Sequence, residues 1–90
     1  MSPFTAVSQS EDFKRRVEKF RSDYPRIDDS VRGIIWRLQR APEDGYKPGP
    51  PAGPKYMMMV FEKPTEDLPG LLLVYEYENN NVILKDLQPF

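Results

Sequence analysis

Two stretches of the chain repeat apolar residues at the three- and four-residue spacing of an amphipathic helix. Ser10 is a suitable N-cap for the first, because its hydroxyl can accept an otherwise unpaired backbone N–H. Pro25 ends this run, since the residue before a proline disfavours the helical conformation. The pattern therefore predicts a helix from Ser10 to about residue 24, with the apolar stripe Phe13, Val17, Phe20 and Tyr24.

A second helix is predicted from about Ser30 to Arg40, where Pro42 limits it. Asp28, Asp29 and Ser30 are its three capping candidates. Because only a short Pro-Arg-Ile-Asp connection separates the two helices, we expect them to form an antiparallel hairpin. The apolar stripe of this helix is Val31, Ile34, Ile35 and Leu38.

The remaining patterned segments alternate at the two-residue period of a strand. Asn79–Asn81 predicts a tight turn, since asparagine tolerates positive φ. Residues 42–55 contain five prolines and three glycines, which is typical of a stiff surface loop. We predict strands at Phe4–Ser8, Tyr56–Glu62, Leu71–Glu78 and Val82–Leu87.

Together these elements predict one α+β domain spanning residues 1–90, with the order β-α-α-β-β-β. The last three strands should form an antiparallel meander, to which Phe4–Ser8 adds at an edge. The helical hairpin should pack on one face of this small antiparallel sheet. The helices can cover only that face.

Composition removes several kinds of chemistry. The chain has no cysteine, which excludes disulfides and thiolate sites, and no histidine, the commonest general base. Its glycines at 45, 49 and 53 lie among prolines that lack the N–H donors of a phosphate-binding loop. We therefore expect no cofactor and no metal. Any catalysis must use lysine, arginine, acidic, tyrosine, serine or backbone groups.

Location and charge narrow the possible partners. The first seven residues have no basic leader or apolar run, and the longest apolar stretch is too short to span a bilayer. We expect a cytoplasmic protein without membrane contact. Residues 1–41 carry nine basic and six acidic residues, and residues 42–90 carry four and eight. A nucleic-acid surface would therefore lie on the helices, although their interspersed acidic residues favour a solvated face.

The element order and three segments resemble the RelE/ParE/HigB toxin superfamily of bacterial toxin–antitoxin systems. The segments are the helix SEDFKRRVEKF, the helix end LQRAPEDG and the strand pair LLLVYEYENNNVILKDL. This resemblance covers nearly the whole chain and implies a toxin that a cognate antitoxin inhibits. The mRNA interferases of the family are endoribonucleases that inhibit translation on the ribosome, so ribosome and mRNA are implied partners.

Enzymatic activity is uncertain, because the expected cations are largely replaced. The RNA-cleaving members use basic residues on the first meander strand, an arginine opening the second, and a basic or aromatic cluster at the C-terminal end. Such cations stabilise the phosphate charge during cleavage. The matching positions here hold Met57, Met59 and Leu72, and residues 86–90 carry no basic cluster. Weak catalytic substitutes that flank the sheet are Lys55, Tyr56, Lys63 and Lys85, although such lysines usually protect strand edges.

The alternative is a non-catalytic protein-interaction module, either a homodimer or a ParE-like target-binding domain. Both faces of the predicted sheet are apolar, so both should be covered. The proline-rich loop or the C-terminus covers the second face, or a partner chain does. We place Met57, Met59, Leu72 and Val74 on this open face as partner-binding residues.

Trp36 is a second candidate for partner binding. It lies off the apolar stripe of its helix, at four-residue spacing from Arg32 and Arg40. An exposed tryptophan between arginines can anchor an interface. The same spacing also suits a cation–π cluster that lies flat on the surface.

Overall fold

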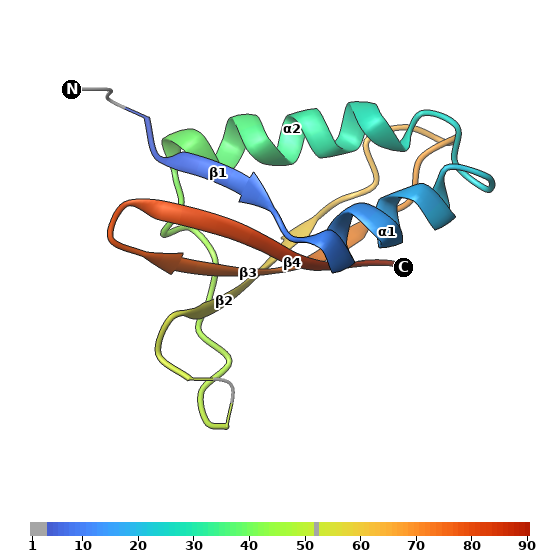
Figure 1. Ribbon diagram of the computed structural model, residues 1–90. Helices are drawn as coiled ribbons and strands as arrows, with labels where there is room; N and C mark the ends of the chain where they lie inside the picture. Colours follow the sequence, from blue (N-terminus) through green and yellow to red (C-terminus); the bar gives the residue numbers. More distant parts are fainter. Residues whose placement is uncertain (1–3, 52) are drawn as a thin grey trace.

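The computed structural model describes residues 4–51 and 53–90, and both helices cover one face of a four-stranded sheet (Figure 1). This arrangement confirms the predicted α+β class and the order β-α-α-β-β-β. The elements are β1 (Ala6–Gln9), α1 (Glu11–Phe20), α2 (Ile27–Arg40), β2 (Tyr56–Phe61), β3 (Leu71–Glu78) and β4 (Asn81–Pro89).

The sheet has the strand order β1-β4-β3-β2. Strands β2, β3 and β4 form the predicted antiparallel meander, and Asn79 and Asn80 take positive φ angles of 53° and 60° in its turn. The expectation of a wholly antiparallel sheet is wrong, because β1 pairs with β4 in parallel. Strand β1 also starts later than predicted, since the N–H of Thr5 donates to the carbonyl of Gln39 in α2 at 2.9 Å instead.

Local signals account well for α1 and less well for α2. The hydroxyl of Ser10 accepts the N–H of Phe13 at 3.1 Å and so caps α1, as predicted. Helix α2 begins at Ile27, three residues before the predicted Ser30. The reason is that this first turn places Ile27 fully inside the core. Ser30 therefore lies within the helix and does not cap it.

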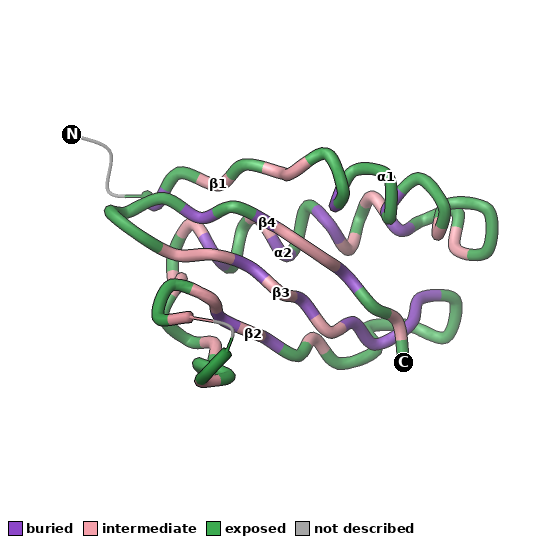
Figure 2. The backbone as a smooth tube through the Cα atoms, turned by 60° about the horizontal axis from the view of Figure 1, so that its bottom comes forward, coloured by how far each residue is buried: buried purple, intermediate pink, exposed green. Residues whose placement is uncertain are grey.

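The core fills the space between the helices and the sheet. Figure 2 shows buried positions alternating with less buried ones along β2 and β3. Tyr75 is fully buried, its hydroxyl donates to the carbonyl of Pro42 at 2.6 Å, and burial raises its pKa to about 12. Tyr77 is partly buried and packs against the same cluster. The buried cluster is Phe13, Val17, Ile27, Val31, Ile34, Leu38, Met57, Met59, Leu71, Leu73, Tyr75, Val82, Leu84 and Leu87.

Met57 and Met59 belong to this core, so their predicted position on the open face is wrong. Each is only 5% exposed. Met57 lies opposite Tyr75, and Met59 lies opposite Leu73. Directly paired residues of neighbouring strands share a face, so the methionines turn toward the helices with their partners. A register shifted by one residue would have exposed them.

Gly33 in α2 provides a test of the helix layer. A methyl group built there meets nothing within 4 Å. Alanine has the higher helix propensity, so Gly33→Ala should raise the free energy of unfolding by about 0.5–1 kcal/mol. Urea denaturation followed by circular dichroism would measure this. A lower free energy of unfolding would show that other residues pack against Gly33 and leave no room for a methyl group.

Candidate functional site

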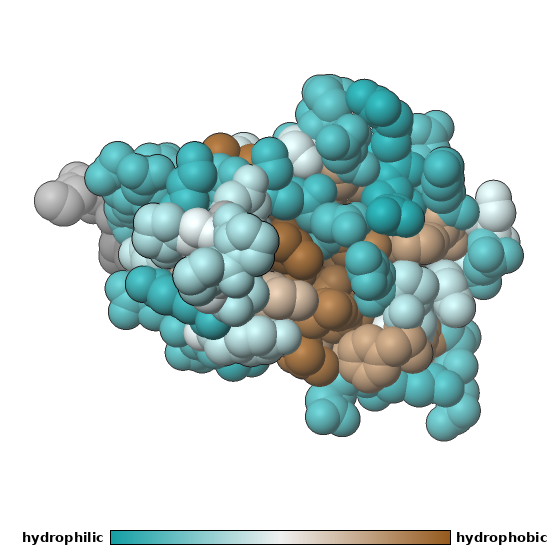
Figure 3. Space-filling model, turned by 90° about the horizontal axis from the view of Figure 1, so that it is seen from below, coloured by the Kyte–Doolittle hydropathy of each residue, from teal (hydrophilic) through white to brown (hydrophobic). Residues whose placement is uncertain are grey.

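The open face of the sheet carries a group of five large aliphatic side chains on β2, β3 and β4, which we call the apolar patch. Figure 3 shows apolar side chains gathered on this face and bordered by hydrophilic ones. Phe90, which follows β4, donates its N–H to the carbonyl of Gly70 just before β3, and the proline-rich loop pairs with the edge of β2 through Tyr46. The patch is thus half-buried to exposed. Its residues are Met58, Val60, Leu72, Val74 and Ile83, of which Val60 is 51% exposed.

The patch confirms one half of the predicted open face. Strand alternation places Leu72 and Val74 there, opposite Val60 and Met58 of β2. On β2 the open face carries Met58, which lies between the two methionines that were predicted there. Sequence reasoning recognised that both faces are apolar but assigned the wrong residues of β2 to each.

Beside the patch, three predicted catalytic residues meet at one carboxylate that sequence reasoning missed. Glu76 lies 3.7 Å from the ammonium nitrogen of Lys55 and 3.9 Å from that of Lys85. The phenol of Tyr56 also hydrogen-bonds to it. The side chain of Glu76 is only 13% exposed. Glu76 alternates with Tyr75 and Tyr77 along β3, which places it on the face away from the core. This alternation is the sequence signal that could have identified Glu76 as part of the site. We call Lys55, Tyr56, Glu76 and Lys85 the Glu76 cluster.

A β-bulge helps to assemble this cluster. The pairing of β3 with β4 shifts between Val74 and Tyr75, so that Lys85 is the extra residue of β4. Bulges redirect side chains and occur often beside functional sites. Here the bulge allows both Lys85 and its neighbour Asp86 to avoid the core. Asp86 then pairs with Arg16 of α1 at 3.0 Å.

The single Glu76 carboxylate of the cluster offsets one of its two lysine charges. The Glu76 carboxylate raises the pKa of Tyr56, first because it accepts the phenolic hydrogen bond and also because it repels a tyrosinate. Both lysines pair with the same carboxylate. The cluster is therefore suited to holding the end of the sheet together, and its lysines are less available to a phosphate than unpaired ones would be.

Lys63, the fourth predicted catalytic residue, lies apart from the cluster. It follows β2 in the segment 62–70, where its ammonium lies 3.4 Å from a carboxylate oxygen of Glu66. The structure therefore joins three of the four candidates and separates the fourth.

Trp36 and Arg40 form the cation–π pair that the helical spacing suggested. The guanidinium of Arg40 lies 4.1 Å from the ring centre of Trp36 and 4.6 Å from that of Phe4. Arg32 instead pairs with Asp29 at 2.6 Å. Trp36 remains 58% exposed, so the stack still leaves much of its surface accessible. These residues lie on α2, across the sheet from the apolar patch.

A groove of about 430 Å³ separates α2 from segment 62–70. Sequence reasoning missed it, because its walls come from distant parts of the chain. Apolar residues line it, among them Ile34, Phe61, Leu68 and Leu71, and Trp36 lies at its edge.

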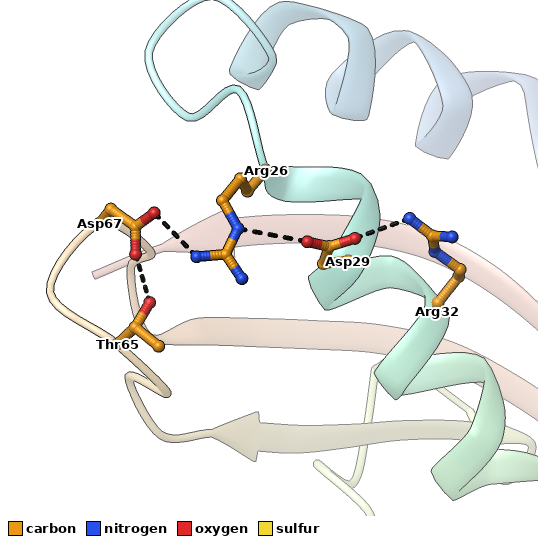
Figure 4. Close-up of polar contacts among 5 residues, drawn as sticks. All are labelled: Arg26, Asp29, Arg32, Thr65 and Asp67. Carbon is orange, nitrogen blue, oxygen red and sulfur yellow. Dashed lines mark hydrogen bonds and ion pairs between the residues drawn. The ribbon is translucent and has the colours of Figure 1, made fainter.

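Ion pairs join the two walls of this groove. Figure 4 shows Arg26 between Asp67 of segment 62–70 and Asp29 of α2, at 3.0 and 3.3 Å. Thr65 donates a further hydrogen bond to Asp67. The Thr65 hydroxyl and the Arg26 guanidinium together hold the pKa of Asp67 below its usual range. This network fixes segment 62–70 to the start of α2.

Within residues 4–51 and 53–90, no three acidic side chains are placed to hold a metal ion together. In the same part of the chain, neither helix has the length and apolar character needed to cross a bilayer. Models of known protein families do not match this chain, and neither do curated protein sequences.

Replacing Glu76 should change the titration of Tyr56. Glu76→Gln removes the carboxylate that stabilises the protonated phenol, so the pKa of Tyr56 should fall toward its ordinary value. The ultraviolet absorbance of tyrosinate as a function of pH measures this. Comparison with Tyr56→Phe identifies the signal of Tyr56. An unchanged titration would contradict the contact.

Acid should weaken the network at Asp67. Its pKa is lower in the folded chain than in the unfolded one, so its stabilisation is present at neutral pH and is lost as pH falls below about 4. Asp67→Asn should therefore destabilise the fold at pH 7, and this difference should shrink at pH 3. Urea denaturation at both pH values measures it. Asp23→Asn is the control, and a loss independent of pH would contradict the role of the ionised carboxylate.

Proposed function

We propose that this chain is a RelE/ParE-like toxin component that acts by binding a protein through the open face of its sheet, without cutting RNA. The observation that carries this proposal is the apolar patch. It includes one of the three positions where the resemblance would place cations, whereas the other two, Met57 and Met59, lie in the core. Leu72 in particular stands at the position expected for an arginine.

Burial energetics support a binding role for the patch. Two of its members, Val60 and Ile83, are exposed, and covering apolar area gains roughly 25 cal/mol per Å². Contiguous exposed apolar surface of this kind marks interaction sites. The helices cannot supply the cover, because both lie on the other face. A cognate antitoxin, a target protein or a second copy of the chain would meet this need.

The charge arrangement beside the patch favours binding over cleavage. Stabilising a cleaved phosphate needs cations with free donors directed at it. Lys55 and Lys85 both lie beside the Glu76 carboxylate, at 3.7 and 3.9 Å, and this carboxylate offsets one of their two charges and would repel a phosphate. Cleavage remains a second candidate, since the Glu76 cluster does bring two lysines and Tyr56 to one place on the open face.

A charge placed in the patch should separate the two candidates. Leu72→Lys would bury an unpaired ammonium in the complex, so partner binding should weaken at least ~100-fold and growth arrest on expression in bacteria should disappear. The double variant Lys55→Ala, Lys85→Ala should still arrest growth. Phe90→Lys is the matched control, because it introduces a lysine at a residue that is 71% exposed and outside the apolar patch. This variant should behave as wild type.

The readouts are bacterial growth, primer extension on cellular mRNA, and co-purification with the product of the neighbouring gene. Sedimentation of the purified protein identifies a second copy as the occupant. The binding proposal fails if the double lysine variant loses both arrest and mRNA cleavage, because the Glu76 cluster would then be catalytic. It also fails if Leu72→Lys arrests growth and binds as wild type does.

A further inference from the structure

The outer edge of β2 is only partly occupied. Strand β2 is the last strand of the sheet, and alternate residues direct their backbone groups away from β3. The carbonyl of Lys55 accepts the N–H of Tyr77, so residues 56, 58 and 60 are the outward ones. Met58 uses both its outward groups, in two 2.9 Å hydrogen bonds with Tyr46. The edge therefore already accepts one antiparallel segment.

Val60 is the next outward residue, and its edge is open. Within residues 4–51 and 53–90, no backbone group pairs with its outward N–H or C=O. The chain around Tyr46 does not continue along the edge, because residues 42–45 turn back toward α2. An exposed β-branched residue with free backbone groups is a template for another strand.

This open edge meets the groove beside α2. Phe61 and Glu62, which follow Val60, line the groove together with Ile34 and Trp36. Its volume of about 430 Å³ is within the range of pockets that bind specific ligands. The groove therefore offers side-chain space directly beside unpaired backbone groups. Those two features are the requirements for recognising an extended peptide.

We propose that the edge at Val60 and the adjoining groove bind an extended peptide segment of a partner protein. The segment pairs with Val60 as an added β-strand and inserts one apolar side chain into the groove. Backbone hydrogen bonds supply affinity, and the groove selects the side chain. This surface is separate from the use of the patch proposed above and does not depend on it.

Charge and shape determine the kind of segment. The arginines that line the groove are already neutralised, since Arg26 pairs with Asp67 and Arg37 pairs with Asp44, each at 3.0 Å. Glu62 also lines the groove and makes no ion pair within the described residues, so the groove disfavours an acidic side chain, and its apolar lining favours an apolar one. Tyr46 occupies the edge at Met58, so the added segment must begin at Val60. A free extended segment satisfies this limit, whereas β2 of a second copy carries its own Tyr46 segment along the same edge.

Two substitutions test the backbone and the groove separately. Val60→Pro removes an outward N–H and leaves the hydrogen bonds to β3 in place, and Val60→Ala is its control. Gly33→Leu fills the groove from a position where an added methyl group meets no atom within 4 Å. Gly33→Ala is the matched control for that variant. Circular dichroism of all four establishes that they fold.

The probe is a random heptapeptide library displayed on phage and selected on the full wild-type chain. Enriched peptides should carry an apolar residue flanked by residues of high β-strand propensity. Their synthetic forms should bind Val60→Pro and Gly33→Leu at least tenfold more weakly than they bind the wild-type chain. Binding to Val60→Ala and Gly33→Ala should be retained. Equal binding to all variants, or no enrichment, would overturn the proposal. Peptides lost only on Leu72→Lys would also overturn it, while supporting a binding role for the apolar patch.

Discussion

The pairing register between β2 and β3 is the constraint on which the rest of this structure depends. It places Met57 opposite Tyr75 and Met59 opposite Leu73, so that these four side chains form the floor of the core beneath the helices. Because side chains alternate along a strand, the same register assigns every other residue of both strands to the open face. The core and the apolar patch are thus two results of one alignment, and neither can change without the other.

That alignment also determines where charge can lie. Glu76 follows the buried Tyr75 and is forced to the open face, where it meets two lysines and Tyr56. A carboxylate that is only 13% exposed requires partners, and the bulge at Lys85 supplies one of them. Lys55 and Lys85, two of the weak catalytic substitutes, in this way lie beside one carboxylate. The surface beside them is apolar, and the binding role that we propose for this face rests on that apolar surface.

The groove on the helix side of the molecule arises from a different set of contacts. Helix α2 passes over the sheet without closing against segment 62–70, and the ion pairs of Arg26 hold the two walls in place. The result is a groove beside the outer edge of β2. A small domain has too few residues to cover each edge and face of its sheet. In this chain Tyr46 covers the edge at Met58, and the described segments leave the edge at Val60 open.

The sequence alone determined the elements whose signals are local: the Ser10 cap, the amphipathic stripes, the asparagine turn and the meander. Helix spacing, capping and turn chemistry act over a few residues, so they can be read without knowing what lies opposite. Only the tertiary structure decided the face taken by Met57 and Met59, the parallel pairing of β1, and the early start of α2 at Ile27. It also decided that Glu76 gathers three candidates while Lys63 lies apart. Each of these depends on which residue lies across from another, and that is set by packing between segments far apart in the chain.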